Sequence, residues 1–242
     1  MSSAAALHRV RIVLCHTSHP GNIGAAARAM RTMGLSRLYL VGPKRFPHPE
    51  AQAFASRASD VLERAVVCDS LSAALNGTVL AVASTARRRD LAPEIVDCRE
   101  ACARLIAHAA VGEVALVFGP ERTGLTIRDV AKCQLLASIP ASAEYGSLNL
   151  AQAVQVFAYE LRMTAMTAQR LPQANVELAT HEEIEGLYRH LEQSLYDSGF
   201  LDPRQPKRLM QRLRRLFGRA RLEKEEVNIL RGFLSALRSK VE

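Results

Sequence analysis

The chain has 242 residues, 48% of them hydrophobic and 23% charged, with no tryptophan and a formal net charge of +8 at pH 7. This length allows one large domain or one domain with a small appendage. No apolar run approaches the ~18 residues of a membrane-spanning helix, and the apolar N-terminal stretch is interrupted by His8, Arg9 and Arg11. We therefore expect a cytoplasmic protein, and its positive charge favours a polyanionic partner.

Five cysteines, an odd number, are spread along the chain without a C-x-x-C pair. This distribution argues against a disulfide framework and against a thiolate zinc site. The neighbouring Cys15, His16 and His19 lack a fourth ligand at a recognisable spacing. We therefore expect reduced thiols and no metal site.

The first two thirds of the chain alternate short β-rich runs with helical stretches. Strands are expected at residues 9–15, 37–41, 65–68, 78–84, 114–119 and 135–140. The helices expected between or after them span residues 22–33, 49–58, 70–75, 98–110, 126–132 and 147–169. Because several strands are apolar on both faces, this alternation predicts an α/β domain with a largely parallel sheet. Ligands bind such sheets at the carboxyl ends of the strands.

The pattern changes after residue 165. Residues 166–179 lose strong periodicity and contain Pro172, which is typical of a linker. Thr180 and Glu183 then form a capping-box pattern, and three apolar stripes at helical spacing follow. The sequence therefore predicts a domain of residues 1–165, a linker of residues 166–179 and a small all-helical extension of residues 180–242.

The helical extension carries a local excess of positive charge. Residues 203–224 contain nine Lys or Arg residues against a single acid, Glu223. Arg208, Arg212 and Arg215 follow one another at spacings of four and three, so they share one helix face. A solvated helix face is the plain interpretation, but the scarcity of interleaved acids favours phosphate binding.

No dinucleotide, P-loop, zincin or hydrolase motif occurs in a suitable context. Three segments are more specific: NIGAAAR at residues 22–28, VFGPERTGL at 117–125 and IPASAEYGSLNLAQAV at 139–154. Together, and in this order, they resemble the three signature motifs of the SpoU/TrmH family of ribose methyltransferases. The segment STARRR at residues 84–89 and the helical tail are also similar to family members that act on tRNA, so nearly the whole chain is covered.

The resemblance implies a SPOUT-type α/β domain, in which helices flank a parallel sheet and a C-terminal trefoil knot binds S-adenosylmethionine. It also implies a homodimer that methylates the ribose 2′-hydroxyl of a pyrimidine, C or U at nucleotide 32, in the anticodon loop of tRNA. Two alternatives are a ribosomal RNA 2′-O-methyltransferase and a non-catalytic RNA-binding factor of the same fold. The tail disfavours the first, and the intact polar residues of the motifs argue against the second.

Methyl transfer from a sulfonium needs no metal, so the protein must position the hydroxyl and manage its proton. The resemblance makes Arg28 the catalytic arginine, contributed to a site that the partner subunit completes. Its role as general base or as phosphate clamp stays open, because a guanidinium is protonated under almost all conditions. Asn22 is expected to shape the turn that orients Arg28, and Glu121 to order the site. Ligand contact is expected of two residues that would otherwise simply cap a helix, Ser147 and Asn149.

The cofactor is placed by the resemblance against small and aliphatic residues, which suit the close approach and apolar surface of adenosine. These residues are Ser84, Thr85, Ala86, Gly119, Ile139, Gly146, Ser147 and Leu148. Three consecutive arginines directly follow Ala86 and are expected to contact tRNA phosphates: Arg87, Arg88 and Arg89.

Overall fold

The computed structural model describes residues 3–85, 93–142, 144, 146–167, 177–202, 204 and 207–238. Within these ranges, seven strands form one parallel sheet in the order β3-β2-β1-β6-β4-β7-β5. The strands are β1 (Val10–Cys15), β2 (Arg37–Val41), β3 (Val66–Cys68), β4 (Thr78–Ser84), β5 (Glu94–Asp97), β6 (Glu113–Phe118) and β7 (Leu135–Ser138). The predicted α/β class with a parallel sheet is confirmed, and the trefoil knot stays a prediction.

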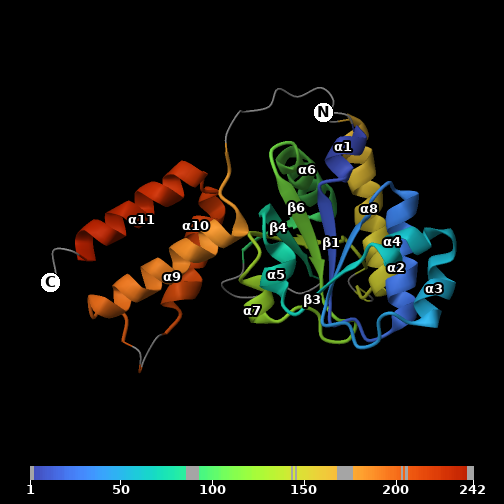
Figure 1. The fold of residues 1–242 in the computed structure, drawn as a ribbon, viewed down its shortest axis with the longest axis horizontal. Helices are drawn as coiled ribbons and strands as arrows, with labels where there is room; N and C mark the ends of the chain where they lie inside the picture. The colour runs from blue at the N-terminus through green and yellow to red at the C-terminus, as the bar shows by residue number, and fades with distance from the viewer. Residues whose placement is uncertain are drawn as a thin grey trace.

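Helices cover both faces of the sheet, which explains why its strands are apolar on both sides. One face packs against α2 (Pro20–Thr32), α6 (Cys98–Ala109) and α8 (Leu150–Thr167), and the other against α5 (Leu71–Leu75) and α7 (Ile127–Val130) (Figure 1). Neighbouring residues of a strand point to opposite faces. Ile12 accordingly belongs to the first core and Val13 to the second, and both are fully buried. The remaining short helices of the domain are α1 (Ser3–Leu7), α3 (Pro49–Ala55), the 3-10 turn η1 (Ser56–Ala58) and α4 (Ser59–Glu63).

Three details differ from the sequence-based expectation. Strand β5 was not expected, because it is a four-residue edge strand with an acid at each end and three of its four residues exposed. The helix expected over residues 49–58 is broken at Ser56, whose φ of 54° is incompatible with an α-helix. Helix α2 begins at Pro20, earlier than expected, because proline is favoured in a first helical turn.

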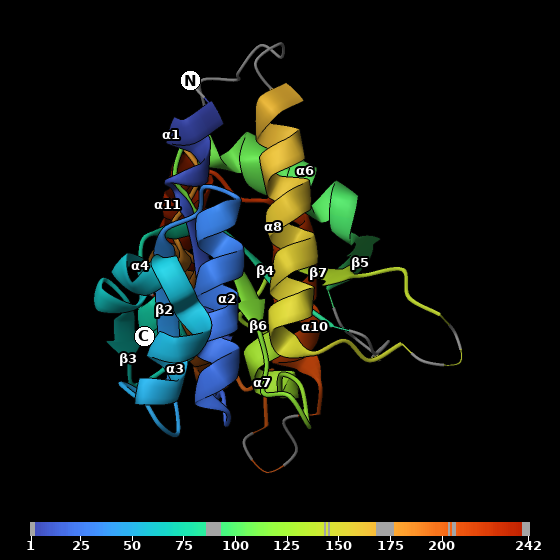
Figure 2. The ribbon, with the colours of Figure 1, turned by 90° about the vertical axis from the view of Figure 1, so that its right-hand side faces the viewer.

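The glycine of the first motif is a packing residue. A Cβ atom on Gly24 would lie 2.1 Å from the backbone oxygen of Ala51 in α3. Helices α2 and α3 therefore approach so closely that only hydrogen fits between them, and α8 lies beside α2 along the other side (Figure 2). The position of α2, which carries the whole first motif, depends on this contact.

We expect Gly24→Ala to lower the free energy of unfolding by about 1–3 kcal/mol, because the added methyl group must displace the backbone of α3. The matched control is Gly232→Ala in the exposed helix α11 (Lys224–Arg238), where a Cβ meets open space. There the same change should stabilise the protein by about 0.5–1 kcal/mol. Urea unfolding of both variants measures the two changes in the free energy of unfolding. If both variants were stabilised, or both destabilised, the packing role of Gly24 would be contradicted.

The tail forms a separate helical layer on the side of α5 and α7 (Figure 1). It consists of α9 (His181–Asp197), α10 (Leu209–Ala220) and α11. The predicted capping box of Thr180 and Glu183 is confirmed at the start of α9. A small core of Ala179, Leu187, Leu222 and Val227 joins the helices. The predicted apolar stripes are only partly buried, since three of their residues stay about half exposed or more, namely Leu216, Phe233 and Leu237.

A hydrogen-bonded contact links the tail to the sheet domain. Both carboxylate oxygens of Glu182 accept the backbone N–H of Gly77, at 2.8 and 2.9 Å. Gly77 has a φ of 77°, a conformation that glycine adopts at little cost. None of the helices among the described residues is both long and apolar enough to cross a membrane.

Candidate active site

The carboxylate of Glu121 collects hydrogen-bond donors from the loop after β1 and from the start of α2. It accepts the backbone N–H of Ser18 at 3.2 Å, the hydroxyl of Ser18 at 2.9 Å and the backbone N–H of His19 at 3.4 Å. The side-chain amide of Asn22 adds the shortest of these N–H bonds, at 2.8 Å. Strands β1 and β6 are neighbours in the sheet, so the loops after their carboxyl ends meet here.

Asn22 extends this network to the third motif. Its side-chain oxygen Oδ1 accepts a hydrogen bond from the side-chain amide of Asn149 at 3.0 Å. The side-chain oxygen of Asn149 in turn accepts one from the backbone N–H of Ala151 at 2.8 Å, in the first turn of α8. The network of Ser18, Asn22, Glu121 and Asn149, called here the motif network, therefore joins all three motifs over 127 residues of sequence.

The sequence-based roles of these residues are now clearer. The expected helix start at residue 147 was wrong, because α8 begins at Leu150 and Asn149 caps it. Glu121 orders the loops around it, as its four donors show. Ser18 was missed, because it lies four residues before the first motif and no motif residue marks it. His19 was considered only as a metal ligand, whereas here its backbone N–H is a donor to Glu121.

Burial of the Glu121 carboxylate opposes its ionisation, but the hydrogen bonds from Asn22 and Ser18 outweigh this and lower its pKa. A carboxylate with a lowered pKa stabilises the fold at neutral pH, and this contribution is lost as the pH falls through the lowered value. The motif network should therefore weaken in acid.

We expect Glu121→Gln to lower the free energy of unfolding at neutral pH by about 1 kcal/mol, because an amide cannot accept every donor that faces Glu121. The difference from the parent protein should stay constant while the pH is above the ordinary glutamate pKa of 4.5, and shrink as the pH falls further, through the lowered pKa of Glu121. Urea unfolding of both proteins between about pH 7 and pH 3 measures this difference in the free energy of unfolding. The control Glu63→Gln changes an exposed acid in α4, and a difference that stays constant over this whole range would contradict the prediction.

A cleft lies beside the motif network at the carboxyl ends of three adjacent strands, β6, β4 and β7. Most of the cofactor residues predicted from the sequence line it: Ser84, Thr85, Gly119, Ile139, Gly146, Ser147 and Leu148. Ala86 lies outside the described residues. Three further apolar residues line the cleft: Phe118, Leu150 and Ala153. The sequence did not suggest them, because they belong to regular elements of the core.

Gly119 lines the cleft and also has a packing role that the sequence did not suggest. A Cβ atom there would lie 2.3 Å from the backbone nitrogen of Leu125 and 2.4 Å from the carbonyl carbon of Gly124. The backbone that approaches Gly119 is therefore its own loop, which turns back at Gly124 with a φ of 66°. This glycine closes the loop that presents Glu121.

Arg28 stands apart from both the cleft and the motif network. It is exposed on α2 and forms no hydrogen bond or ion pair within the described ranges. It follows Asn22 by six positions, which places the two side chains about 120° apart around the helix. The structure of a single chain therefore does not bring Arg28 to the other predicted catalytic residues.

The predicted RNA contacts fall into two groups. Arg87, Arg88 and Arg89 lie outside the described residues. Arg208, Arg212 and Arg215 are all exposed, but Arg208 precedes α10 as its N-cap residue, so of the three only Arg212 and Arg215 lie within the helix. Arg214 on the same helix is instead half-buried, where it pairs with Glu185 at 2.5 Å and lies over the ring of Tyr188. Among the described residues, no group of three His, Cys, Asp or Glu side chains is arranged to hold a metal ion.

Comparison with known proteins identifies the relatives of the chain. Residues 9–159 match the SpoU rRNA Methylase family, and residues 182–242 match the C-terminal domain of the tRNA methyltransferase TrmJ. The tRNA (cytidine/uridine/adenosine-2′-O-)-methyltransferase TrmJ of Pseudomonas aeruginosa is 50% identical over 240 residues, which cover 95% of this chain and 93% of that one. The tRNA (cytidine/uridine-2′-O-)-methyltransferase TrmJ of Klebsiella pneumoniae is 48% identical over 239 residues, with 96% and 97% covered.

A solved structure supports the same relationship. The crystal structure of TrmJ from Z. mobilis ZM4 superposes with a TM-score of 0.83 at 34% identity, covering 94% of this chain and 98% of that one. The match includes the helical tail as well as the sheet domain, because it spans nearly all of both chains. The chain therefore belongs to the SpoU methylase family and, within it, to the TrmJ proteins.

Proposed function

We propose that this protein transfers a methyl group from S-adenosylmethionine to the ribose 2′-hydroxyl of a pyrimidine at nucleotide 32 in tRNA. The observation that carries the proposal is the motif network, in which Asn22, Glu121 and Asn149 come together beside a cleft at the carboxyl ends of the strands. The names of relatives that are about half identical over nearly the whole chain support the reaction and the tRNA substrate.

The cleft fits an adenosine-containing cofactor. Gly146 and Ser147 leave room for a close approach to the backbone, while Ile139, Leu148 and Leu150 supply aliphatic surface for a purine. Bound there, S-adenosylmethionine would supply an electrophilic methyl group that already carries its activating positive charge. The residues of the chain then have to hold the ribose in line and stabilise the oxygen as it loses its proton.

We assign Arg28 to a site that two copies of the chain complete. A guanidinium that is exposed and unpaired in the described part of one chain is available to a second copy. Helix α8, which lies beside α2, offers an apolar surface for that contact, since Tyr159, Met163 and Met166 are 49%, 43% and 57% exposed at spacings of four and three. The homodimer is therefore part of the proposal.

Arg28 would act most simply as a phosphate clamp. A guanidinium keeps its proton under almost all conditions, so it binds and orients an anionic group more readily than it removes a proton. Near the reacting oxygen, the same charge stabilises the developing oxyanion. The general-base role stays open as the alternative.

The helical tail is proposed to hold the tRNA backbone through Arg208, Arg212 and Arg215, which are exposed at the start of α10 and along it. Arg87, Arg88 and Arg89 are proposed to add phosphate contacts next to the cofactor cleft. We retain the division into residues 1–165, 166–179 and 180–242 as a proposal, and we place the enzyme in the cytoplasm with its substrate.

The proposal is tested by incubating the purified chain with labelled S-adenosylmethionine and either tRNA or ribosomal RNA transcripts. We expect label in tRNA alone, and mapping of 2′-O-methyl groups should place it at nucleotide 32. Transcripts with each of the four bases at that nucleotide would define the base preference. Label only in ribosomal RNA would favour the first alternative function. Calorimetry without cofactor binding would favour a non-catalytic RNA-binding factor.

A further inference from the structure

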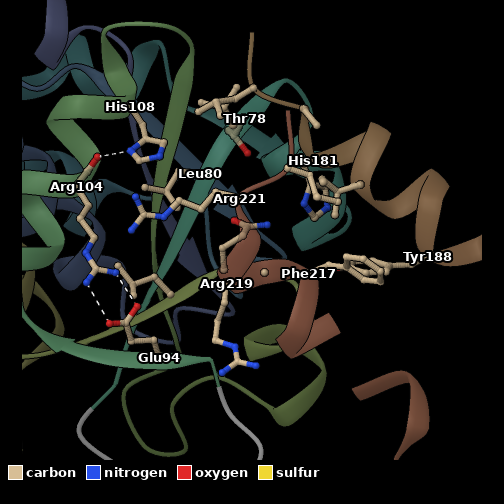
Figure 3. Close-up of a pocket in the computed structure, with 18 residues that line it drawn as sticks. Thr78, Leu80, Glu94, Arg104, His108, His181, Tyr188, Phe217, Arg219 and Arg221 are labelled. Carbon is tan, nitrogen blue, oxygen red and sulfur yellow. Dashed lines mark hydrogen bonds and ion pairs between the residues drawn. The ribbon is translucent and has the colours of Figure 1, made fainter. Parts of the chain in front are cut away.

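A second cavity lies where the tail meets the sheet domain, and we call it the junction cavity. Its lining comes from β4, β5, β7, α6 and the tail, and includes Leu80, Glu94, His108, His181, Phe217 and Arg221 (Figure 3). It shares no lining residue with the cleft at the carboxyl ends of the strands. The function proposed above therefore leaves this cavity unused.

Positive charge gathers at the junction cavity. Arg104 is already neutralised, because it pairs with Glu94 at 2.7 Å and also with Glu100. Arg219 and Arg221 are exposed, and within the described ranges neither forms an ion pair or a side-chain hydrogen bond. The Arg221 guanidinium extends into the cavity, whereas that of Arg219 points away from Arg221 and His181 (Figure 3). Glu94, which pairs with Arg104, also lines the cavity and attracts Arg221 without an ion pair between them.

The backbone of Arg221 gives an independent reason to look for a role of its side chain. Arg221 caps α10 in the left-handed conformation, with φ 52° and ψ 61°. Glycine is the usual residue at such a helix end, because any other residue type is strained there. A residue kept in an unfavourable backbone conformation often has a functional side chain. Here that side chain extends into the junction cavity toward His108 (Figure 3).

His181 adds an unsatisfied polar group at the same place. Its side chain lines the cavity at the start of α9 and is only 3% exposed (Figure 3). Neither ring nitrogen has a hydrogen-bond partner among the described residues. Burial lowers the pKa of His181, so the neutral ring carries one N–H that lacks an acceptor. Leaving such a buried donor unpaired is unfavourable, and an acceptor bound in the cavity would remove that cost.

We propose that the junction cavity is a phosphate-binding site, in which Arg221 supplies the charge and His181 a neutral donor. Guanidinium groups match phosphate because their N–H groups form a planar fork. The phosphate comes either from the RNA backbone or from a free anion. The RNA source rests on the tRNA substrate proposed above, and it would continue the exposed basic face of α10.

The test uses Arg221→Gly in the full-length chain. This change removes the guanidinium and places glycine where the backbone favours it, so the variant should fold at least as stably as the parent. The control is Arg64→Gly, which removes an exposed arginine at the end of α4, on the other side of the sheet. Two measurements are made on each protein: tRNA binding at several salt concentrations, and thermal unfolding with inorganic phosphate or chloride at equal ionic strength.

For an RNA phosphate, we expect Arg221→Gly to weaken tRNA binding by on the order of tenfold. The slope of log affinity against log salt should fall by about one, whereas Arg64→Gly should change neither quantity. For a free phosphate, inorganic phosphate should raise the Tm of the parent but not of Arg221→Gly, with tRNA affinity unchanged. If Arg221→Gly left the salt slope unchanged and phosphate did not raise the Tm of the parent, the proposed phosphate-binding site would be contradicted. Failure of the parent to methylate tRNA would overturn the proposed function alone, because protection by phosphate needs no RNA.

Discussion

Replacing Arg28 with alanine should reduce kcat for methyl transfer by about 10²–10³-fold while leaving the fold intact. Arg28 is exposed and makes no contact that the described part of the chain needs for stability, so the melting temperature should stay within about 1–2 °C of the parent value. A steady-state assay with tRNA and S-adenosylmethionine measures the rate, and circular dichroism measures the fold.

Two further variants make the Arg28 experiment decisive. Arg28→Lys keeps the charge but loses the planar fork, so it should also lose most of the rate. Near-full activity in that variant would contradict both the clamp and the base roles. Arg31→Ala is the matched control on the same helix, because Arg31 is also exposed and forms only a long surface ion pair with Asp60, at 3.5 Å. It should be nearly as active as the parent.

Changing Asn22 to aspartate should cost at least about 10²-fold in activity, because it breaks the motif network with almost no change in size. The Asn22 amide donates to Glu121 at 2.8 Å, and a carboxylate in its place would face another carboxylate at that distance. The two charges would repel and raise the pKa of the pair, so part of the activity lost at neutral pH should return as the pH is lowered. A pH–rate profile measures this recovery.

The control for Asn22→Asp is Asn76→Asp, which adds the same charge at an exposed position after α5. That variant should keep the parent rate and pH profile. Equal activity of the Asn22 and Asn76 variants would contradict a role for the motif network in the reaction. Isothermal titration with S-adenosylmethionine separates lost cofactor binding from lost catalysis, since Asn22 does not line the cofactor cleft.

Hydrophobic periodicity predicted the elements that bury a regular apolar face. Six of the seven strands and the three tail helices were recognisable, because a buried face repeats at a fixed spacing along the chain. Strand β5 was missed for the same reason, since it buries only Val96 among its four residues. The break at Ser56 was missed because a single positive φ leaves no periodic trace in the sequence.

The motifs also identified by themselves which residues would matter, including Asn22, Glu121 and Asn149. Only the tertiary structure decided that these three bond to one another, because a hydrogen bond between residues 99 or 127 positions apart depends on which strands become neighbours. It likewise decided that Arg28 stands outside the site of its own chain and that a basic cavity opens under the tail. The sequence determined the elements and the chemistry because both depend on local residue types. The pairing of distant loops and the seating of the tail depend on how complete elements pack, and that information exists only in three dimensions.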